Sequence, residues 1–201
     1  MKKRQPLITY LVTIILIYAL WYVLSLLLGS NLLPDPFLVL RQGISELDKG
    51  LFWSHVGLSL YRILAGLFFG FILAVPIGLF LGSNERFDRL FAPLIYLGYP
   101  IPKIVLMPII FVLFGLGDIG KIFLITMIIF FQLLITTRDS ARKISKEVIY
   151  SLQSLGGNRW HFYRHVVWPI SLPGIFTSLR IGTGTAVAVL FFPRGAVAVV
   201  G

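Results

Sequence analysis

The chain has 201 residues, of which 57% are hydrophobic and 13% charged, and it contains no cysteine. Soluble domains average about 25% charged residues, so a water-soluble monomer of this size could not cover so much apolar surface. The net charge is +10, but the cations lie between long apolar runs, which predicts a membrane protein and argues against nucleic acid as a partner. The lack of cysteine excludes disulfides, thiolate metal sites and cysteine nucleophiles. We expect no catalytic, metal or cofactor residues in this chain.

The first apolar run covers residues 7–28 and contains no charged residue. It is long enough to cross about 30 Å of hydrocarbon, and it exceeds the apolar region of about 7–15 residues found in cleavable signal peptides. Two lysines and an arginine precede it at positions 2–4. Residues 1–28 are therefore expected to form an uncleaved transmembrane helix with its amino end in the cytoplasm.

Residues 29–58 follow as a segment on the outer side. Pro34 and Pro36 favour an extended turn near its start. From residue 38 to 51 the apolar residues recur with a helical period, which predicts a short amphipathic helix lying at the outer membrane interface.

Four further apolar spans are expected within a core of residues 59–192. They cover about 59–82, 91–115, 121–137 and 173–192, and the second of these is interrupted by four prolines. The chain is thus predicted to be an all-α integral membrane protein with about five transmembrane helices. With a cytoplasmic start, eleven lysines and arginines fall in inside segments and two in outside segments, which agrees with the positive-inside rule.

The long polar segment of residues 138–172 lies inside the cell in this topology. A helical pattern stops at Gly156 and Gly157, a pair that ends helices readily because glycine adopts positive φ at little cost. A second short helix is expected through Trp160 and Val166, ended by Pro169. Two helices around a glycine turn form a compact knob, and its aromatic residues indicate a docking surface for a cytoplasmic partner.

This segment resembles the coupling motif of ABC importer permeases, which reads Glu-Ala-Ala, three residues, Gly, nine residues, Ile-x-Leu-Pro. Gly156 stands at the glycine position, and Val166-x-Trp168-Pro169 follows at the matching spacing. Several other blocks resemble the nitrate/sulfonate/taurine/bicarbonate branch of that family: Pro34-Asp35-Pro36, Ser59-Leu60-Tyr61-Arg62, Gly78 to Gly82, Pro100-Ile101-Pro102-Lys103 and Leu179-Arg180-Ile181-Gly182.

The resemblance implies a permease subunit that pairs with a second permease copy, is contacted by two cytoplasmic ABC ATPase subunits, and receives substrate from a periplasmic or surface solute-binding protein. ATP would be used by the ATPase, since the chain has no G-x-x-x-x-G-K-[ST] phosphate loop. Tyr150 replaces the usual glutamate, and Glu147 is the candidate to take over its role. The residues that the resemblance places in the ATPase-coupling loop are Glu147, Tyr150, Leu155, Gly156, Gly157, Trp160, Val166 and Pro169.

Apart from Lys121 at the first position of its span, three cations fall within the apolar spans. Arg62 and Arg180 are candidates for a translocation pathway because ionisable groups at membrane depth are functional by default, although both could instead reach the interface with their long side chains. Lys103 follows the helix break at Pro100 and Pro102, and broken helices line cavities. Lys103 could therefore lie on an anion pathway together with these two prolines, or extend to the inner face. Asp118 is expected to be a turn residue.

The expected substrate is a small anion such as nitrate, a sulfonate, taurine or bicarbonate, or else a molecule resembling a thiamin precursor. The expected location is the plasma membrane of a prokaryote, which is the inner membrane in a Gram-negative cell. Residues 193–201 depart from the family pattern, so a truncated, inactive permease paralogue is an alternative. A secondary transporter is less expected because the spans lack acidic residues, and an intramembrane hydrolase lacks paired catalytic groups.

Overall fold

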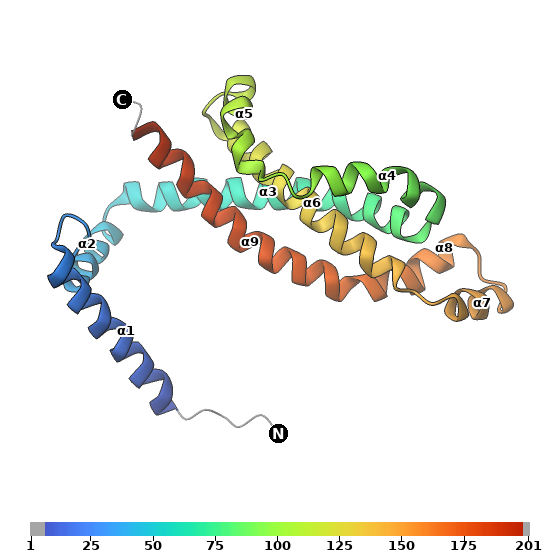
Figure 1. Cartoon of the computed structure of the whole chain (residues 1–201), viewed down its shortest axis with the longest axis horizontal. Coiled ribbons are helices and arrows are strands. Elements are labelled where there is room, and N and C mark those ends of the chain that lie inside the picture. Colours follow the sequence, from blue (N-terminus) through green and yellow to red (C-terminus); the bar gives the residue numbers. More distant parts are fainter. Residues whose placement is uncertain (1–6, 199–201) are drawn as a thin grey trace. The chain divides into compact units, whose positions relative to one another are not determined.

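The computed structural model describes residues 7–198, with side chains described over 8–191 except at 146 and 153. The described residues form helices joined by short turns, without a strand (Figure 1). In chain order the helices are α1 Leu7–Leu28, α2 Pro36–Leu47, α3 Gly50–Ser83, α4 Glu85–Gly98, η1 Lys103–Leu106, α5 Met107–Phe114, α6 Asp118–Arg142, α7 Lys146–Ser154, α8 Arg159–Phe162, η2 Tyr163–Val167 and α9 Trp168–Ala198. The chain divides into two compact units between Gly57 and Leu58, which are described separately below.

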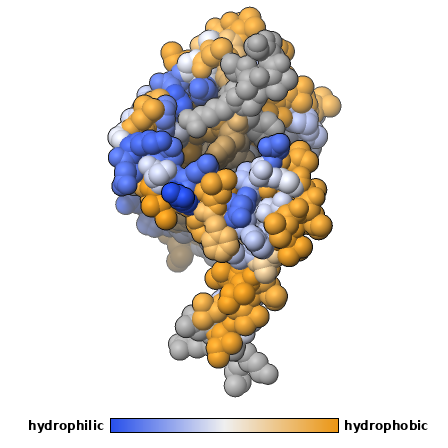
Figure 2. Space-filling view, turned by 90° about the vertical axis from the view of Figure 1, so that its left-hand side faces the viewer, coloured by the Kyte–Doolittle hydropathy of each residue, from blue (hydrophilic) through white to orange (hydrophobic). Residues whose placement is uncertain are grey.

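The first unit contains α1 and α2. The surface of α1 is apolar along its length, as its orange column in Figure 2 shows, and side chains such as Ile15 and Leu27 are largely exposed. A helix that is apolar on all sides is suited to hydrocarbon, and α1 coincides with the expected run 7–28. The amphipathic helix α2 begins and ends a few residues earlier than expected, because Asp35 caps it by accepting a hydrogen bond from the Phe37 amide at 2.6 Å and Pro36 occupies its first turn.

In the second unit, α3 and α6 run in parallel along a stripe of small residues. These residues recur every fourth position of α3, at Gly66, Gly70, Ala74, Gly78 and Gly82. A Cβ added to Gly70 would lie 2.8 Å from Cγ2 of Ile129, and one added to Gly78 would lie 2.9 Å from the carbonyl oxygen of Leu134. Small residues at this spacing let two membrane helices approach closely, where van der Waals packing holds them.

The long helix α9 runs antiparallel to α6 and packs along it (Figure 1). Gly182 of α9 lies against Ile129 of α6, whereas Gly174, earlier in α9, lies against Ser140, later in α6. The Gln132 side chain donates a hydrogen bond across this interface to the Ser178 carbonyl at 3.3 Å. Since α6 contacts α3, α4, α5 and α9, it forms the centre of this unit.

The expected span 91–115 is a bent pair of helices. α4 and the η1–α5 segment meet at 74° across a break that contains Pro100 and Pro102, both of which limit helix continuation. Among the described residues, four helices are long and apolar enough to cross a membrane, and the bent pair makes a fifth if it counts as one span. The expectation of about five transmembrane helices is confirmed when the bent pair counts as one span.

Candidate functional site

Between α6 and α9 the chain forms the knob, which comprises α7, the turn 155–158 and α8. Gly156 adopts φ +77°, the left-handed conformation that disfavours residues with a Cβ. The next amide, that of Gly157, donates to the Leu152 carbonyl at 2.9 Å and so closes the end of α7. Asn158 then caps α8 by accepting a hydrogen bond from the His161 amide at 2.9 Å.

The knob presents large apolar side chains to its surroundings. Tyr150, Leu155 and Trp160 are 61%, 84% and 66% exposed. Three large apolar groups exposed on one short segment form the kind of surface that is buried against a partner. We call these three residues the knob triad.

The remaining coupling-loop residues have different positions. Glu147 is exposed on α7, whereas Val166 is buried. Pro169 was expected to end the second short helix, and this expectation is wrong: Pro169 is the second residue of α9, and the helix runs from Arg159 to Phe191 without a break. The five-residue π-helix η2 precedes this position, and the Trp168 amide donates to the Tyr163 carbonyl five residues back. This wider winding keeps the chain helical up to Pro169.

A pocket of about 430 Å³ separates the knob from the end of α3. Its lining residues are Phe80, Ser83, Asn84, Ile149, Leu152, Gly157, Asn158, Arg159, Phe162 and Tyr163. At one side of the pocket the Asn84 amide donates hydrogen bonds to the Phe80 carbonyl at 2.8 Å and to the Tyr163 hydroxyl at 3.1 Å. This pair of bonds connects the end of α3 to η2 next to the knob.

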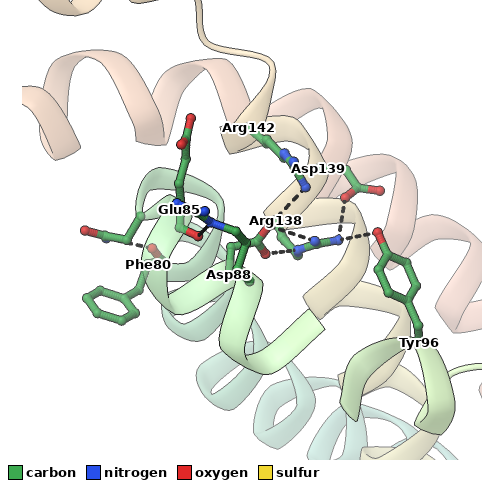
Figure 3. Close-up of polar contacts among 9 residues, drawn as sticks. Phe80, Glu85, Asp88, Tyr96, Arg138, Asp139 and Arg142 are labelled. Atoms are coloured by element: carbon green, nitrogen blue, oxygen red, sulfur yellow. Dashed lines mark hydrogen bonds and ion pairs between the residues drawn. The ribbon is translucent and has the colours of Figure 1, made fainter. Parts of the chain in front are cut away.

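Eight residues before α7 begins, at Arg138, α6 is joined to α4 by a buried ion pair (Figure 3). Arg138 donates to both carboxylate oxygens of Asp88, with Nη2 and Oδ2 at 2.9 Å. Its Nη1 also donates to the Tyr96 hydroxyl and to Asp139 Oδ1, each at 3.2 Å. Arg142 adds a second contact to Asp88, at 3.0 Å. These five residues form the base network of the knob.

Sequence reasoning missed this network. It counted Arg138 and Arg142 only as cytoplasmic cations and gave Asp88 no role. A usable signal was present, because Asp88 lies seven residues before the buried Ile95 and so on the same side of α4. An acid on an otherwise apolar helix face needs a partner, and Arg138 is a cation at the end of an apolar run.

The structure places the three intramembrane cations in different surroundings. Arg62 is buried, and its guanidinium contacts Asp118 Oδ1 through Nη2 at 2.5 Å and Nε at 2.7 Å. The expectation that Asp118 is only a turn residue is wrong, because Asp118 begins α6 and neutralises Arg62 across 56 positions of sequence.

Lys103 closes the helix break. Its ammonium donates to the carbonyls of Gly98 at 2.5 Å and Tyr99 at 2.7 Å, and it lies 4.3 Å from the centre of the Phe131 ring. It therefore satisfies the last carbonyls of α4, which the turn at Pro100 and Pro102 leaves without helical partners. Arg180, in contrast, is exposed on α9, and within residues 8–191 no hydrogen bond or ion pair involves its side chain.

Together, the apolar spans, the bent helix pair and an exposed apolar knob between two spans define a multi-pass α-helical membrane protein. Residues 66–193 match the family of binding-protein-dependent transport system inner membrane components. The chain belongs to this family. It is the permease subunit of an ABC importer, not an enzyme, and the ATPase is a separate subunit.

Relatives with curated names agree with this family. The chain is 31% identical to the taurine transport system permease protein TauC of Escherichia coli, over 90% of this chain and 68% of TauC. It is also 31% identical to the riboflavin transport system permease protein RibX of Chloroflexus aurantiacus, over 87% of this chain and 66% of RibX. It thus spans about two thirds of the length of each.

The fold is similar to that of a chain in an inward-facing structure of the MetNI methionine ABC transporter. The TM-score is 0.58 at 22% identity, covering 67% of this chain and 68% of that chain. Family membership implies an ATPase and a substrate-binding protein as partners.

Proposed function

We propose that this permease subunit imports a small anion such as nitrate, a sulfonate, taurine or bicarbonate, and that the knob is where the ATPase subunit docks. The observation that carries the docking part is the knob triad. Tyr150, Leu155 and Trp160 stand exposed on the segment between two membrane spans, and burial of such residues in a partner's groove supplies most of the binding energy of an interface.

The base network supports a mechanical role for the knob. Arg138 and Asp88 join the last turns of α6 to α4, eight residues before the knob. The Asn84–Tyr163 hydrogen bond joins the end of α3 to η2, which follows the knob. A displacement of the knob by the ATPase would therefore be passed to α3, α4, α6 and α9 together. This is how a small movement at one site becomes a rigid-body movement of packed helices.

The anionic substrate is supported by charge and by one relative. Among the cations inside the spans, Arg180 keeps a free charge in the described part of the chain, and free positive charge at membrane depth favours anions. The name of TauC refers to taurine, which carries a sulfonate. We further propose a cytoplasmic amino end, in line with the positive-inside count, and a pathway formed between two permease copies within the membrane lipid.

The docking proposal is tested by Leu155→Glu, with Leu155→Met as the matched control. Leu155 is 84% exposed, so neither substitution removes packing inside the subunit, but a buried glutamate in the partner's groove is costly. The measurements are co-purification of the ATPase subunit with the permease in detergent, and ATP-dependent uptake into proteoliposomes supplied with the binding protein. We expect Leu155→Glu to lose both and Leu155→Met to keep both.

A second test uses the turn. Gly156→Asp and Gly156→Asn place side chains of equal size at a residue with positive φ, a conformation that both tolerate better than other residues do. We expect Gly156→Asp to abolish coupling while leaving membrane insertion intact. Uptake at the wild-type rate by Gly156→Asp and Leu155→Glu would overturn the docking role of the knob. Uptake confined to a neutral compound such as riboflavin, with none of taurine, nitrate or bicarbonate, would overturn the anionic substrate.

A further inference from the structure

Helix α9 has two opposite faces with different surroundings. One face is buried against α6 and carries Ile175, Ser178, Gly182, Ala186 and Val189. The other face is exposed and carries Pro173, Phe176, Thr177, Arg180, Thr183, Gly184 and Val187. The residues of the buried set are spaced three or four apart and form one stripe, and the residues of the exposed set all fall on the opposite side of the helix and form a second, broader stripe. Of these two stripes, the exposed one carries a charged side chain, that of Arg180, and the buried one carries none.

Arg180 lies near the middle of its membrane span. At about 1.5 Å per residue it is about 10 Å along the helix from Pro173, the expected start of the span, and about 17 Å from Phe191. Neither end is within reach of an arginine side chain, so the guanidinium cannot escape to the membrane interface as cations near helix ends do. A charged residue at this depth faces protein or a water-filled cavity rather than lipid.

The groups beside Arg180 do not neutralise it. The hydroxyls of Thr177 and Thr183 donate to the carbonyls of Pro173 at 2.8 Å and Leu179 at 2.9 Å, inside their own helix. Gly184, one turn further on, leaves open space, because a Cβ built there would meet nothing within 4 Å. The two other intramembrane cations differ, since Arg62 is paired with Asp118 and Lys103 binds backbone carbonyls.

We infer that the exposed stripe of α9 around Arg180 lines a water-filled pathway, and that the Arg180 guanidinium is the group in it that binds the negatively charged end of the transported solute. This inference rests on the proposed import of a small anion and assigns that import to one side chain. The guanidinium fits a sulfonate, nitrate or carboxylate group, because it presents several donors in one plane. The bare backbone at Gly184 provides the space beside it.

The chain has no cysteine, so single cysteines can be placed and probed without removing others. Thr177→Cys and Gly184→Cys put a thiol within one turn of Arg180, and Leu73→Cys puts one on a half-exposed apolar position in the middle of α3 as a control. The full chain in native membranes is treated with an anionic sulfonatoethyl or a cationic trimethylammonium-ethyl methanethiosulfonate. Labelling after denaturation in SDS measures the total thiol.

We expect Thr177→Cys and Gly184→Cys to react in intact membranes and Leu73→Cys to react only after denaturation. We also expect the anionic reagent to react faster than the cationic one at Gly184→Cys. Adding Arg180→Gln should reduce this preference about fivefold, whereas adding Arg180→Lys should keep it, because the effect is Coulombic over a short distance.

Failure of this inference is distinguishable from failure of the proposed function. If the thiols at 177 and 184 react only in SDS, the exposed stripe is not in contact with water and the inference is overturned. The uptake assays described under the proposed function still decide the importer's substrate in that case. If they react in membranes with equal rates for both reagents, with and without Arg180, the role of Arg180 toward anions is overturned.

Discussion

Arg138 and Asp88 form a bidentate ion pair whose side chains are only 1% and 6% exposed, although the two residues lie 50 positions apart in the sequence. The pair is surrounded by weaker contacts, from Tyr96 and Asp139 to the guanidinium and from Arg142 to the carboxylate. Its geometry satisfies both charges with direct hydrogen bonds, which is the condition under which a buried pair is tolerated. The base of the knob therefore depends on both partners being present.

Asp88→Asn should lower the free energy of unfolding by about 3 kcal/mol, because the change leaves the Arg138 charge buried with fewer acceptors. Thermal unfolding in detergent measures this effect. The matched control is Asp139→Asn, since Asp139 contacts the same guanidinium but its side chain is 51% exposed. Its effect should stay within about 1 kcal/mol. Equal effects of the two variants would contradict the central role of Asp88.

The double variant Asp88→Asn with Arg138→Met separates the pair from its surroundings. Removing both charges leaves neither one unpaired, so the double variant should be less destabilised than the sum of the two single variants. A strictly additive result would show that the two side chains do not depend on each other.

Gly78→Ala should destabilise the α3–α6 interface by about 1–3 kcal/mol. The added Cβ would lie 2.8 Å from the Thr137 Cβ and 2.9 Å from the Leu134 carbonyl oxygen, and a backbone atom cannot turn away. Gly57→Ala is the matched control in the same helix, because nothing lies within 4 Å of its added Cβ. It should be neutral or stabilising by up to about 1 kcal/mol, since alanine favours helix. Unfolding of both variants in detergent gives the comparison.

Asp118→Asn should lower the free energy of unfolding by about 1–2 kcal/mol, which lies between the losses measured when buried and exposed ion pairs are broken. Arg62 is 11% and Asp118 43% exposed at their side chains, so the loss is reduced by solvent on the Asp118 side. Glu46→Gln removes the partner of Lys49 in a pair that is exposed on both sides, and it should change stability by less than about 1 kcal/mol. Chemical unfolding of the two variants would reveal whether burial of Arg62 matters.

Lys103→Met should loosen the break between α4 and η1. The ammonium donates to two carbonyls at the end of α4, and a thioether cannot replace it as a donor. Amide hydrogen exchange of residues 98–106 should accelerate about tenfold, which corresponds to about 1.4 kcal/mol. Lys143→Met, at the exposed end of α6, should leave these amides unchanged. Unchanged exchange in Lys103→Met would show that the carbonyls do not need the lysine.

The membrane spans could be predicted from the sequence because the hydropathy of a span is summed over about 20 residues. One or two polar residues do not change that sum enough to hide the span. The left-handed turn at Gly156 could be predicted for a similar reason, since few residues other than glycine adopt that conformation. Pro169 was misjudged because a proline inside a membrane helix does not always end it. Pro76 lies inside α3 and Pro93 inside α4, and the π-helix η2 keeps the chain helical up to Pro169.

The charged pairs could not be predicted in the same way. Arg62 and Asp118, and likewise Arg138 and Asp88, meet only after the helices have packed, and local spacing carries no information on such distances. The small residues at every fourth position of α3, from Gly66 to Gly82, are a local pattern that could have been read in advance as a close helix contact. What it could not reveal is that α6 is the helix against which they pack.

The helical stretch α8, η2 and α9 has no turn between its parts, and this continuity has a mechanical consequence. A torque applied to α8 by a bound subunit would act on the same continuous helix that carries Arg180. Rotation at the cytoplasmic end would then reorient the guanidinium about the helix axis without a hinge to absorb it. The π-helix η2 is wound more widely than the α-helices on either side, so it is the part of this stretch that can deform. The hydrogen bond from Asn84 to Tyr163 restrains η2.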